Sequence, residues 1–234
     1  MKFLAPQVAL RIFTAILILL GSLSEALANE FTPPSELPSS NIERARLVEA
    51  LNEDSTPEQM KVAYLAELAL LTSSSDTRVE QVESLEEKMA QLKRSLDNDP
   101  ELSAALGSTI SFRSSFYIDQ LAKLSLFSRR GNRMMDRAVK QAPFNLGARL
   151  QRGISCANMP AFLKRARYAV EDLELVQQQI GGKYGEEFQA FVEFYLAQAY
   201  ERNEQTDQAK ELWGKLTGSE TDWAQKSRQA LEKL

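Results

Sequence analysis

Apolar residues in this chain recur at spacings of three and four, which is the period of an α-helix. The clearest run occupies positions 82, 85, 89, 92 and 96, where every residue is Val, Leu or Met. The sequence contains no sustained alternation of apolar and polar residues, which is the pattern of a half-buried β-strand. It therefore predicts an all-α fold.

Two segments carry the signature of a helix start. Thr56 precedes Pro57 and is followed three residues later by Gln59, so the side chains of Thr56 and Gln59 can form a capping box. Asp99 and Pro100 repeat the arrangement of a capping residue followed by proline. Because the helix that begins at Pro57 is apolar on nearly every side, we expect it to be buried.

The N-terminus has the composition of a secretory signal peptide. Lys2 and Arg11 carry positive charge, residues 12–20 are apolar, and residues 26–28 (Ala-Leu-Ala) fit the cleavage pattern. We expect cleavage after Ala28 and a mature protein that is periplasmic or otherwise exported. In the alternative, a retained membrane anchor, Arg11 would lie inside the apolar span, which is unfavourable.

The remaining sequence divides into a tether and one domain. Residues 29–40 contain three prolines and are predicted to be a disordered tether, whereas residues 41–234 are predicted to form the helical domain. After residue 28 no apolar stretch is long enough to cross a bilayer, so the cleaved protein is not expected to span a membrane. Cys156 is the only cysteine, so no intramolecular disulfide can form, and we expect its side chain to be buried.

One segment near the C-terminus resembles a tetratricopeptide repeat. Leu196, Ala197 and Tyr200 occupy the Leu, Gly and Tyr places of the first helix of that repeat. Ala209 and Trp213 then fall at the Ala and aromatic places of the second helix. In such repeats the small residues let paired helices approach closely, and the large residues fill the space between them.

Two earlier segments extend the resemblance. Gly131, Met135, Ala138 and Pro143 match a second helix, whose first helix would run from Phe112 to Phe127 with Asp119 at the Gly place. Gly153 lies at the next Gly place, 34 residues after Asp119, which is the repeat length of the family. A following second helix matches at three further positions, which are Ala166, Val170 and Leu173.

The resemblance covers residues 112–221 and implies a specific architecture and binding surface. The architecture is a right-handed superhelix of stacked antiparallel helix pairs, a tetratricopeptide-like α-solenoid, similar to exported bacterial proteins without an assigned activity. In that family the first helix of each repeat lines a concave groove that binds a protein or peptide. Carried over position by position, the groove residues would be Arg113, Phe116, Gln120, Lys123, Leu150, Ile154, Asn158, Phe194, Gln198, Glu201 and Arg202.

The composition excludes much enzyme chemistry. The chain has no histidine, which removes Ser-His and Cys-His nucleophile pairs and most zinc and iron sites. We therefore expect no metal, no cofactor and no catalytic residue. Carboxylate pairs such as Glu86-Glu87 and Glu186-Glu187 leave glycan cleavage as a remote alternative, although adjacent residues on a helix point about 100° apart. Residues 181–185 (Gly-Gly-Lys-Tyr-Gly) lack the ending of a phosphate-binding loop, and a flexible turn is expected there.

Charge is strongly segregated along the chain. Residues 123–167 hold 11 basic residues and one acid, whereas residues 29–110 and 168–234 have net charges of −9 and −6. Four of the basic residues follow a 3-4-3 spacing that places them along one side of a single helix. These residues, which we name the basic belt, are Arg130, Arg133, Arg137 and Lys140.

Two interpretations of the basic block remain open. In the first, which the acidic flanks favour, neighbouring carboxylates neutralise it, with Asp136, Glu171 and Asp172 pairing Arg149, Arg152 or Arg167. In the second, the basic belt binds an anion such as a lipid phosphate, an acidic protein segment or a C-terminal carboxylate. Nucleic acid is not expected, because the exported chain is acidic overall and its basic residues are not interleaved with aromatic ones.

The sequence thus predicts a helical-repeat scaffold of the cell envelope that binds a protein or peptide partner. The alternative is an accessory or carrier protein that holds an anionic envelope molecule through the basic belt.

Overall fold

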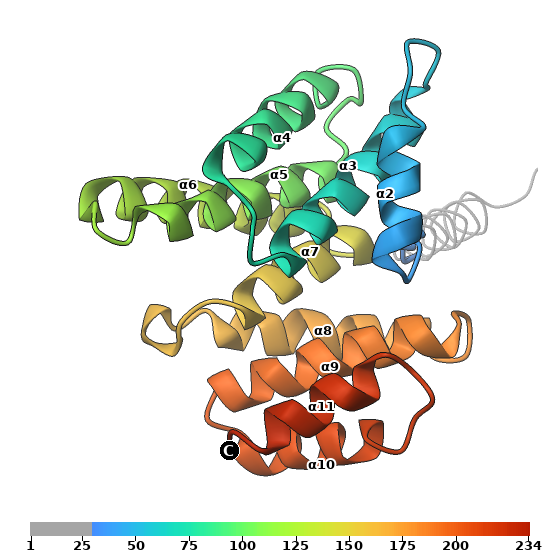
Figure 1. Cartoon of the computed structure of the whole chain (residues 1–234), viewed down its shortest axis with the longest axis vertical. Coiled ribbons are helices and arrows are strands. Elements are labelled where there is room, and N and C mark those ends of the chain that lie inside the picture. The colour runs from blue at the N-terminus through green and yellow to red at the C-terminus, as the bar shows by residue number, and fades with distance from the viewer. Residues whose placement is uncertain (1–29) are drawn as a thin grey trace, which may run out of the picture.

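The computed structural model describes residues 30–234 (Figure 1), so the predicted cleavage after Ala28 lies outside the described residues. Within them the chain is all-α, as predicted, and the one β-type feature is an isolated bridge between Thr32 and Asn145. The α-helices are α2 (Asn41–Glu49), α3 (Pro57–Ser73), α4 (Val79–Leu92), α5 (Pro100–Arg113), α6 (Leu121–Gln141), α7 (Leu146–Ala157), α8 (Ala166–Ile180), α9 (Glu186–Arg202), α10 (Thr206–Leu216) and α11 (Trp223–Leu231). Two short 3₁₀ helices, η1 (Ser114–Tyr117) and η2 (Ala161–Leu163), lie in the connections.

Both predicted helix starts are confirmed. The Thr56 hydroxyl accepts a hydrogen bond from the backbone N–H of Gln59 at 3.2 Å, and the Gln59 side chain accepts one from the Thr56 N–H at 2.8 Å. At the start of α5, the Asp99 carboxylate accepts a hydrogen bond from the N–H of Leu102 at 2.7 Å. Each cap pairs backbone donors that the first helical turn leaves without a partner.

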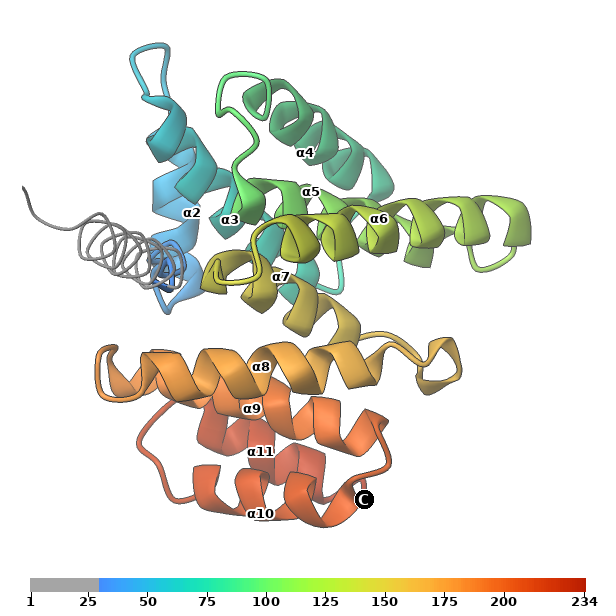
Figure 2. The ribbon, with the colours of Figure 1, turned by 180° about the vertical axis from the view of Figure 1, so that it is seen from behind.

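The helices form two groups that α7 joins. Consecutive helices pack against each other within α2–α6 and within α8–α11, and α7 contacts α5 on one side and α8 on the other. Figure 1 shows the first group above and the second below, and Figure 2 shows the same stack from behind. One core lies among α3, α4 and α5, a second among α7, α8 and α9, and a third among α9, α10 and α11.

Helix α5 is the central element of the first group, which the sequence resemblance did not predict. It contacts α3, α4, α6 and α7, and every residue from Glu101 to Ser111 is buried. The predicted single helix Phe112–Phe127 is wrong, because α5 ends at Arg113 and α6 begins only at Leu121. The chain reverses direction between these helices, so that α6 can return along α5.

Glycines permit the close crossing of α5 and α6. An added Cβ at Gly107 would lie 2.9 Å from the Gly131 carbonyl oxygen, and one at Gly131 would lie 2.6 Å from the backbone nitrogen of Ser111. Real Cβ atoms do not approach other atoms this closely, so any side chain at these positions would push the helices apart.

The residues matched to later repeats fall on paired helices. An added Cβ at Gly153 of α7 would lie 2.7 Å from the Leu173 Cγ of α8, as expected for a close helix contact. Ala197 of α9 and Trp213 of α10 are buried where these helices meet, and Leu196 of α9 is buried in the core that α9 shares with α7 and α8. These residues therefore lie at contacts between successive helices, whereas the repeat register itself stays a prediction.

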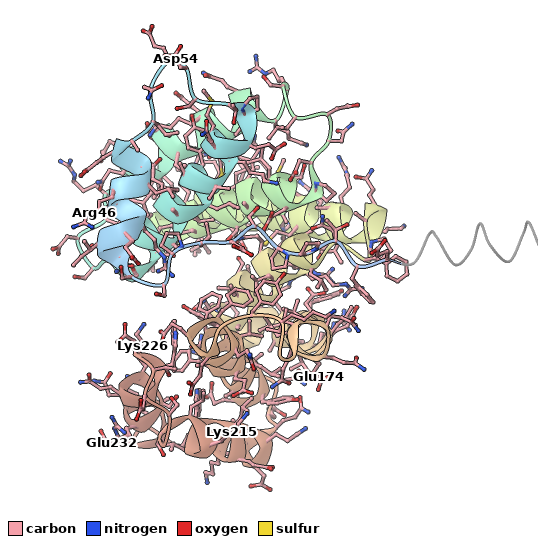
Figure 3. All side chains as sticks on the ribbon, turned by 90° about the vertical axis from the view of Figure 1, so that its right-hand side faces the viewer. Arg46, Asp54, Glu174, Lys215, Lys226 and Glu232 are labelled. Carbon is pink, nitrogen blue, oxygen red and sulfur yellow. The ribbon has the colours of Figure 1, made fainter. Side chains whose placement is uncertain are left out.

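The segment predicted to be a disordered tether is docked on the domain, and the structure corrects that expectation. Thr32 exchanges backbone hydrogen bonds with Phe144 and Leu146, and the Ser35 hydroxyl donates to the Glu101 carboxylate at 2.6 Å. Burial raises the pKa of Glu101, although the bonds from Ser35 and the charge of Lys61 oppose this shift. Figure 3 shows the segment crossing the molecule at the seam between the two helix groups. Composition alone missed these contacts, because they depend on partners more than 60 residues away in the chain.

Cys156 is buried, as predicted, and its thiol is expected to be inert. Its exposed fraction is 0%, and burial raises the pKa of the thiol from its ordinary value of 9.0 to about 11. Because the thiolate is the reactive form, we expect no alkylation of the folded protein by iodoacetamide at neutral pH and full alkylation after denaturation. Mass spectrometry measures this, and rapid labelling of the folded protein would contradict it.

The same shift predicts a pH dependence of stability. The folded state holds the thiol proton more tightly than the unfolded state, so the free energy of unfolding should fall as pH rises from about 9 to about 11. The contribution of Cys156 amounts to roughly 3 kcal/mol at most, from about 1.4 kcal/mol per pKa unit. Urea titrations across this pH range should show a smaller decrease in the free energy of unfolding for Cys156→Ala, which has no thiol to ionise, than for the unchanged protein. Equal decreases in the two proteins would contradict the raised pKa of Cys156.

Candidate anion-binding cleft

Helix α6 carries the basic belt on the side opposite its packing face. Gly131, Met135, Ala138 and Val139 are buried against neighbouring helices. The four belt side chains, in contrast, are exposed. Because the helix repeats every 3.6 residues, the spacing of three and four keeps the two sets on separate sides.

Three belt arginines line a cleft of about 550 Å³ between α6 and the segment that joins α4 to α5. Lys93, at the end of α4, adds a fourth cation, and Lys140 does not line the cleft. The remaining lining is polar or apolar without charge, and no described lining residue is acidic. The complete lining is Lys93, Asn98, Pro100, Ser103, Arg130, Arg133, Met134, Arg137, Ala138, Gln141 and Ala142.

Two carboxylates near the cleft, those of Asp99 and Glu86, are paired with cations outside its lining. Asp99 caps α5 and contacts Lys61 at 3.0 Å. Glu86 contacts Arg113 at 2.8 Å and reaches Arg130 only at 3.7 Å, with the Arg130 side chain 54% exposed. Among residues 30–234, Arg133 and Arg137 form no ion pair. The cleft therefore presents positive charge to solvent.

Three other arginines of the basic block, Arg149, Arg152 and Arg165, are neutralised, as the first interpretation predicted for Arg149 and Arg152. Asp172 of α8 is fully buried and accepts hydrogen bonds from Arg149 at 2.7 Å and from the Arg152 Nε at 2.6 Å. Asp136 of α6 accepts hydrogen bonds from Arg152 and from Arg165. Burial opposes the charge of Arg165, but the bonds to Asp136 contribute to raising its pKa overall.

Carboxylates of the described chain do not neutralise Arg167 or most of the basic belt, so the first interpretation holds for only part of the block. The Arg167 guanidinium lies 4.7 Å from the centre of the Tyr168 ring and pairs with no acid of the described chain. Asp136 of α6 and Asp172 of α8 pair with arginines of α7 and with Arg165, whereas the belt side chains are exposed on the other side of α6. The basic block therefore contains both arginines that are paired with carboxylates inside the protein and a basic surface that is open to solvent.

Several predicted groove residues are used for packing. Leu150 belongs to the buried core, which corrects its place in the groove, and Ile154 packs against the same core. Phe194 contacts the rings of Trp213 and Trp223. Phe116 packs against the first core.

The polar members of the predicted groove are dispersed. Arg113, at the end of α5, pairs with Glu86 and stacks on Phe127, with 3.7 Å between the guanidinium carbon and the ring centre. The structure brings together Asn158 and Gln198, whose side chains share a hydrogen bond of 3.0 Å. The other predicted polar residues, Gln120 and Lys123 at the start of α6 and Glu201 and Arg202 at the end of α9, lie at separate places.

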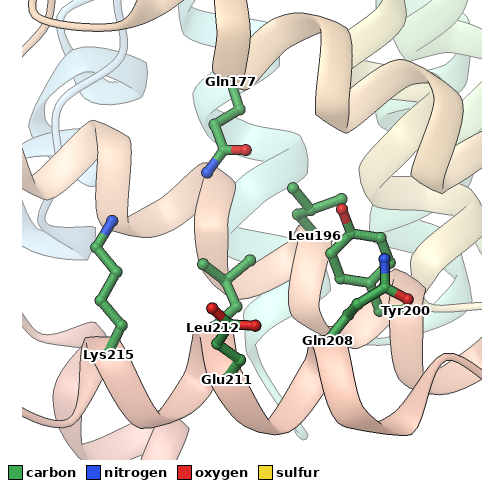
Figure 4. A pocket seen from close by; sticks show the side chains of 7 residues that line it. All are labelled: Gln177, Leu196, Tyr200, Gln208, Glu211, Leu212 and Lys215. Carbon is green, nitrogen blue, oxygen red and sulfur yellow. The ribbon is translucent and has the colours of Figure 1, made fainter.

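A second cleft of about 390 Å³ lies among α8, α9 and α10 (Figure 4). Leu196 and Leu212 are among its lining residues, with Gln177, Glu211 and Lys215 beside them. Its charged side chains have opposite signs, and Lys215 also pairs with Glu193. This cleft therefore offers no excess of either charge to a ligand.

Within residues 30–234 no group of three or more Cys, Asp and Glu side chains is arranged to hold a metal ion. In the same part of the chain, none of the helices combines the length and the apolar character needed to cross a membrane.

The chain matches no protein-family model, no curated protein and no solved structure. The likeness to tetratricopeptide repeats accordingly rests on the sequence positions and on the helix pairs described above.

Sequence reasoning identified the belt but missed the other wall of the cleft. Lys93, Asn98 and Ser103 come from the end of α4, the following turn and α5. No sequence spacing links these residues to Arg133, because the two walls meet only through the packing of α5 against α6.

Proposed function

We propose that this protein is a helical-repeat binding protein of the cell envelope that holds an acidic segment of a partner protein in the cleft along α6. The observation that carries the proposal is that three arginines and Lys93 line one open cleft without an acidic lining residue. Within the proposal, the stacked helix pairs continue as a right-handed tetratricopeptide-like superhelix, and the protein is exported after removal of its signal peptide. Its role is binding and not catalysis, in keeping with a histidine-free chain.

The spacing of the cations favours a chain over a single small anion. Arg130 and Arg137 are separated by seven residues, which corresponds to about 10 Å along a helix. Alternate side chains of an extended peptide are about 7 Å apart, so two acidic side chains can each reach a different arginine. Met134 and Ala138 also line the cleft and offer apolar contact to the peptide backbone and side-chain stems.

The proposal predicts binding of a fluorescent peptide in which glutamate alternates with serine. Reversal of Arg130, Arg133 and Arg137 to glutamate should weaken this binding at least tenfold, as measured by fluorescence anisotropy at low salt, because each charge-assisted contact is lost. The melting temperature should change little, since these side chains are exposed and surface substitutions usually cost within about 0.5 kcal/mol.

A matched control separates a local site from overall charge. Lys183, Lys210 and Lys233 are exposed and lie outside the cleft, and their reversal to glutamate changes the net charge by the same amount. This control should retain most of the affinity, and a peptide with glutamine in place of glutamate should not bind. Equal loss in both triple variants, or a folded Arg variant with unchanged affinity, would overturn the proposal.

Inorganic phosphate and phosphatidylglycerol vesicles serve as competitors in the same assay. If either displaces the peptide at concentrations far below those of other anions, the cleft is specific for phosphate and the peptide proposal is wrong.

A further inference from the structure

Exposed apolar side chains are concentrated on two projections of the molecule. Among the described residues seven large apolar side chains are exposed. Five of them lie at two places, one comprising the turn after η1 with the first two turns of α6, and the other η2. We name these five residues the apolar tips. They are Ile118 (73% exposed), Leu121 (73%), Leu126 (57%), Phe162 (78%) and Leu163 (39%).

The two projections lie on the same side of the molecule. The turn before α6 and the loop that carries η2 both extend to the left in Figure 1, and both extend to the right in the reversed view of Figure 2. The remaining exposed large apolar residues, Ile42 and Leu234, lie on α2 and at the last position of the chain. Single exposed apolar residues are ordinary, but such a gathering marks an interaction surface.

Basic residues lie beside both groups of apolar tips. Lys123 and Arg129 are exposed beside the apolar tips at the start of α6, and Lys164 and Arg167 are exposed beside those on η2. The acidic residue exposed within 118–130 is Asp119, and residues 158–170 contain no acid. Apolar side chains set among cations are suited to the surface of an anionic bilayer, where the apolar groups enter the interface and the cations meet lipid phosphates.

We propose that the apolar tips dock the protein on an anionic membrane surface. The shape supports a membrane over a protein partner, because the apolar residues lie on two separate projections on one side of the molecule, and a planar surface can contact both. Docking uses a different surface from the peptide cleft, so this inference goes beyond the proposed function and does not depend on it.

The test is flotation of the folded protein, residues 29–234, with vesicles. The protein should float with vesicles of phosphatidylcholine and phosphatidylglycerol and should not float with phosphatidylcholine alone. Replacing Leu121 and Phe162 together by serine should weaken the association at least tenfold, because two large apolar side chains no longer enter the interface. Ile42→Ser is the matched control, since Ile42 is similarly exposed (69%) on another surface, and it should float like the unchanged protein.

A second readout reports insertion directly. Fluorescence of Phe162→Trp should be quenched by brominated lipid beyond the level of the unchanged protein, whose Trp213 and Trp223 are buried. Retained flotation of the Leu121 and Phe162 variant, or no extra quenching, would overturn the proposal. So would flotation that is lost on reversal of Arg130, Arg133 and Arg137 but not on substitution of the tips, because lipid headgroups would then bind in the cleft. Acidic-peptide binding by the tip variants should be unchanged, which keeps this test separate from that of the proposed function.

Discussion

Replacement of Asp172 by alanine is expected to destabilise the fold by about 3–5 kcal/mol, which is the usual effect of removing one partner from a buried ion pair. Asp172 is 0% exposed and accepts hydrogen bonds from both Arg149 and Arg152, whose side chains are 11% and 7% exposed. Without the carboxylate, the two guanidinium groups stay buried with only Asp136 and the outer Glu171 nearby. Chemical denaturation measures the loss.

Glu171→Ala is the control for this prediction. Glu171 precedes Asp172 on α8 and contacts Arg149 at 3.4 Å, but its side chain is 62% exposed. Because water screens an exposed pair, its loss should cost less than about 1 kcal/mol. A similar loss of unfolding free energy in the two variants would show that the burial of Asp172 does not determine how much its ion pairs stabilise the fold. A stable Asp172→Ala variant would contradict the geometry of the α7–α8 contact.

The second large effect is expected for Gly131→Ala, which should destabilise the protein by roughly 1–3 kcal/mol through overpacking. The new methyl group would meet the Gly107 carbonyl oxygen and lie 2.6 Å from the Ser111 nitrogen. These are backbone atoms, so α5 and α6 must separate to accommodate it. Since α5 is the central helix of the first group, the displacement should also disturb the cleft and weaken peptide binding.

Gly214→Ala provides a control with the opposite expected sign. Gly214 lies within α10, and an added Cβ there has no atom within 4 Å. Alanine is favoured over glycine inside a helix by about 1 kcal/mol, so this variant should be slightly stabilised. Thermal melting of the two variants compares the same chemical change in crowded and open surroundings. Stabilisation of both would mean that α5 and α6 do not cross as closely as described.

Sequence patterns within one or two helical turns predicted helix starts and buried helix faces correctly where neighbouring residues in the chain determine them. The cap at Thr56 and the proline after it act within one helical turn, so the start of α3 could be read from four residues. The stripe that begins at Val82 is likewise a local pattern, and its residues at positions 82, 85, 89 and 92 are buried on α4. The same rules failed at Phe112–Phe127, because the reversal there serves the packing of α6 on α5 and not a local preference.

The sequence by itself determined the helical class, the two capped starts, the burial of Cys156 and the alignment of Arg130, Arg133 and Arg137 on one side of a helix. Each of these follows from spacing within a few residues or from the composition of one segment. Only the tertiary structure decided which charges stay free. Arg152 meets a buried acid across α7 and α8, whereas Arg133 faces solvent, although both belong to one basic block. The physical reason is that an ion pair depends on the distance between two side chains in space, and helix packing sets that distance independently of their separation in the chain.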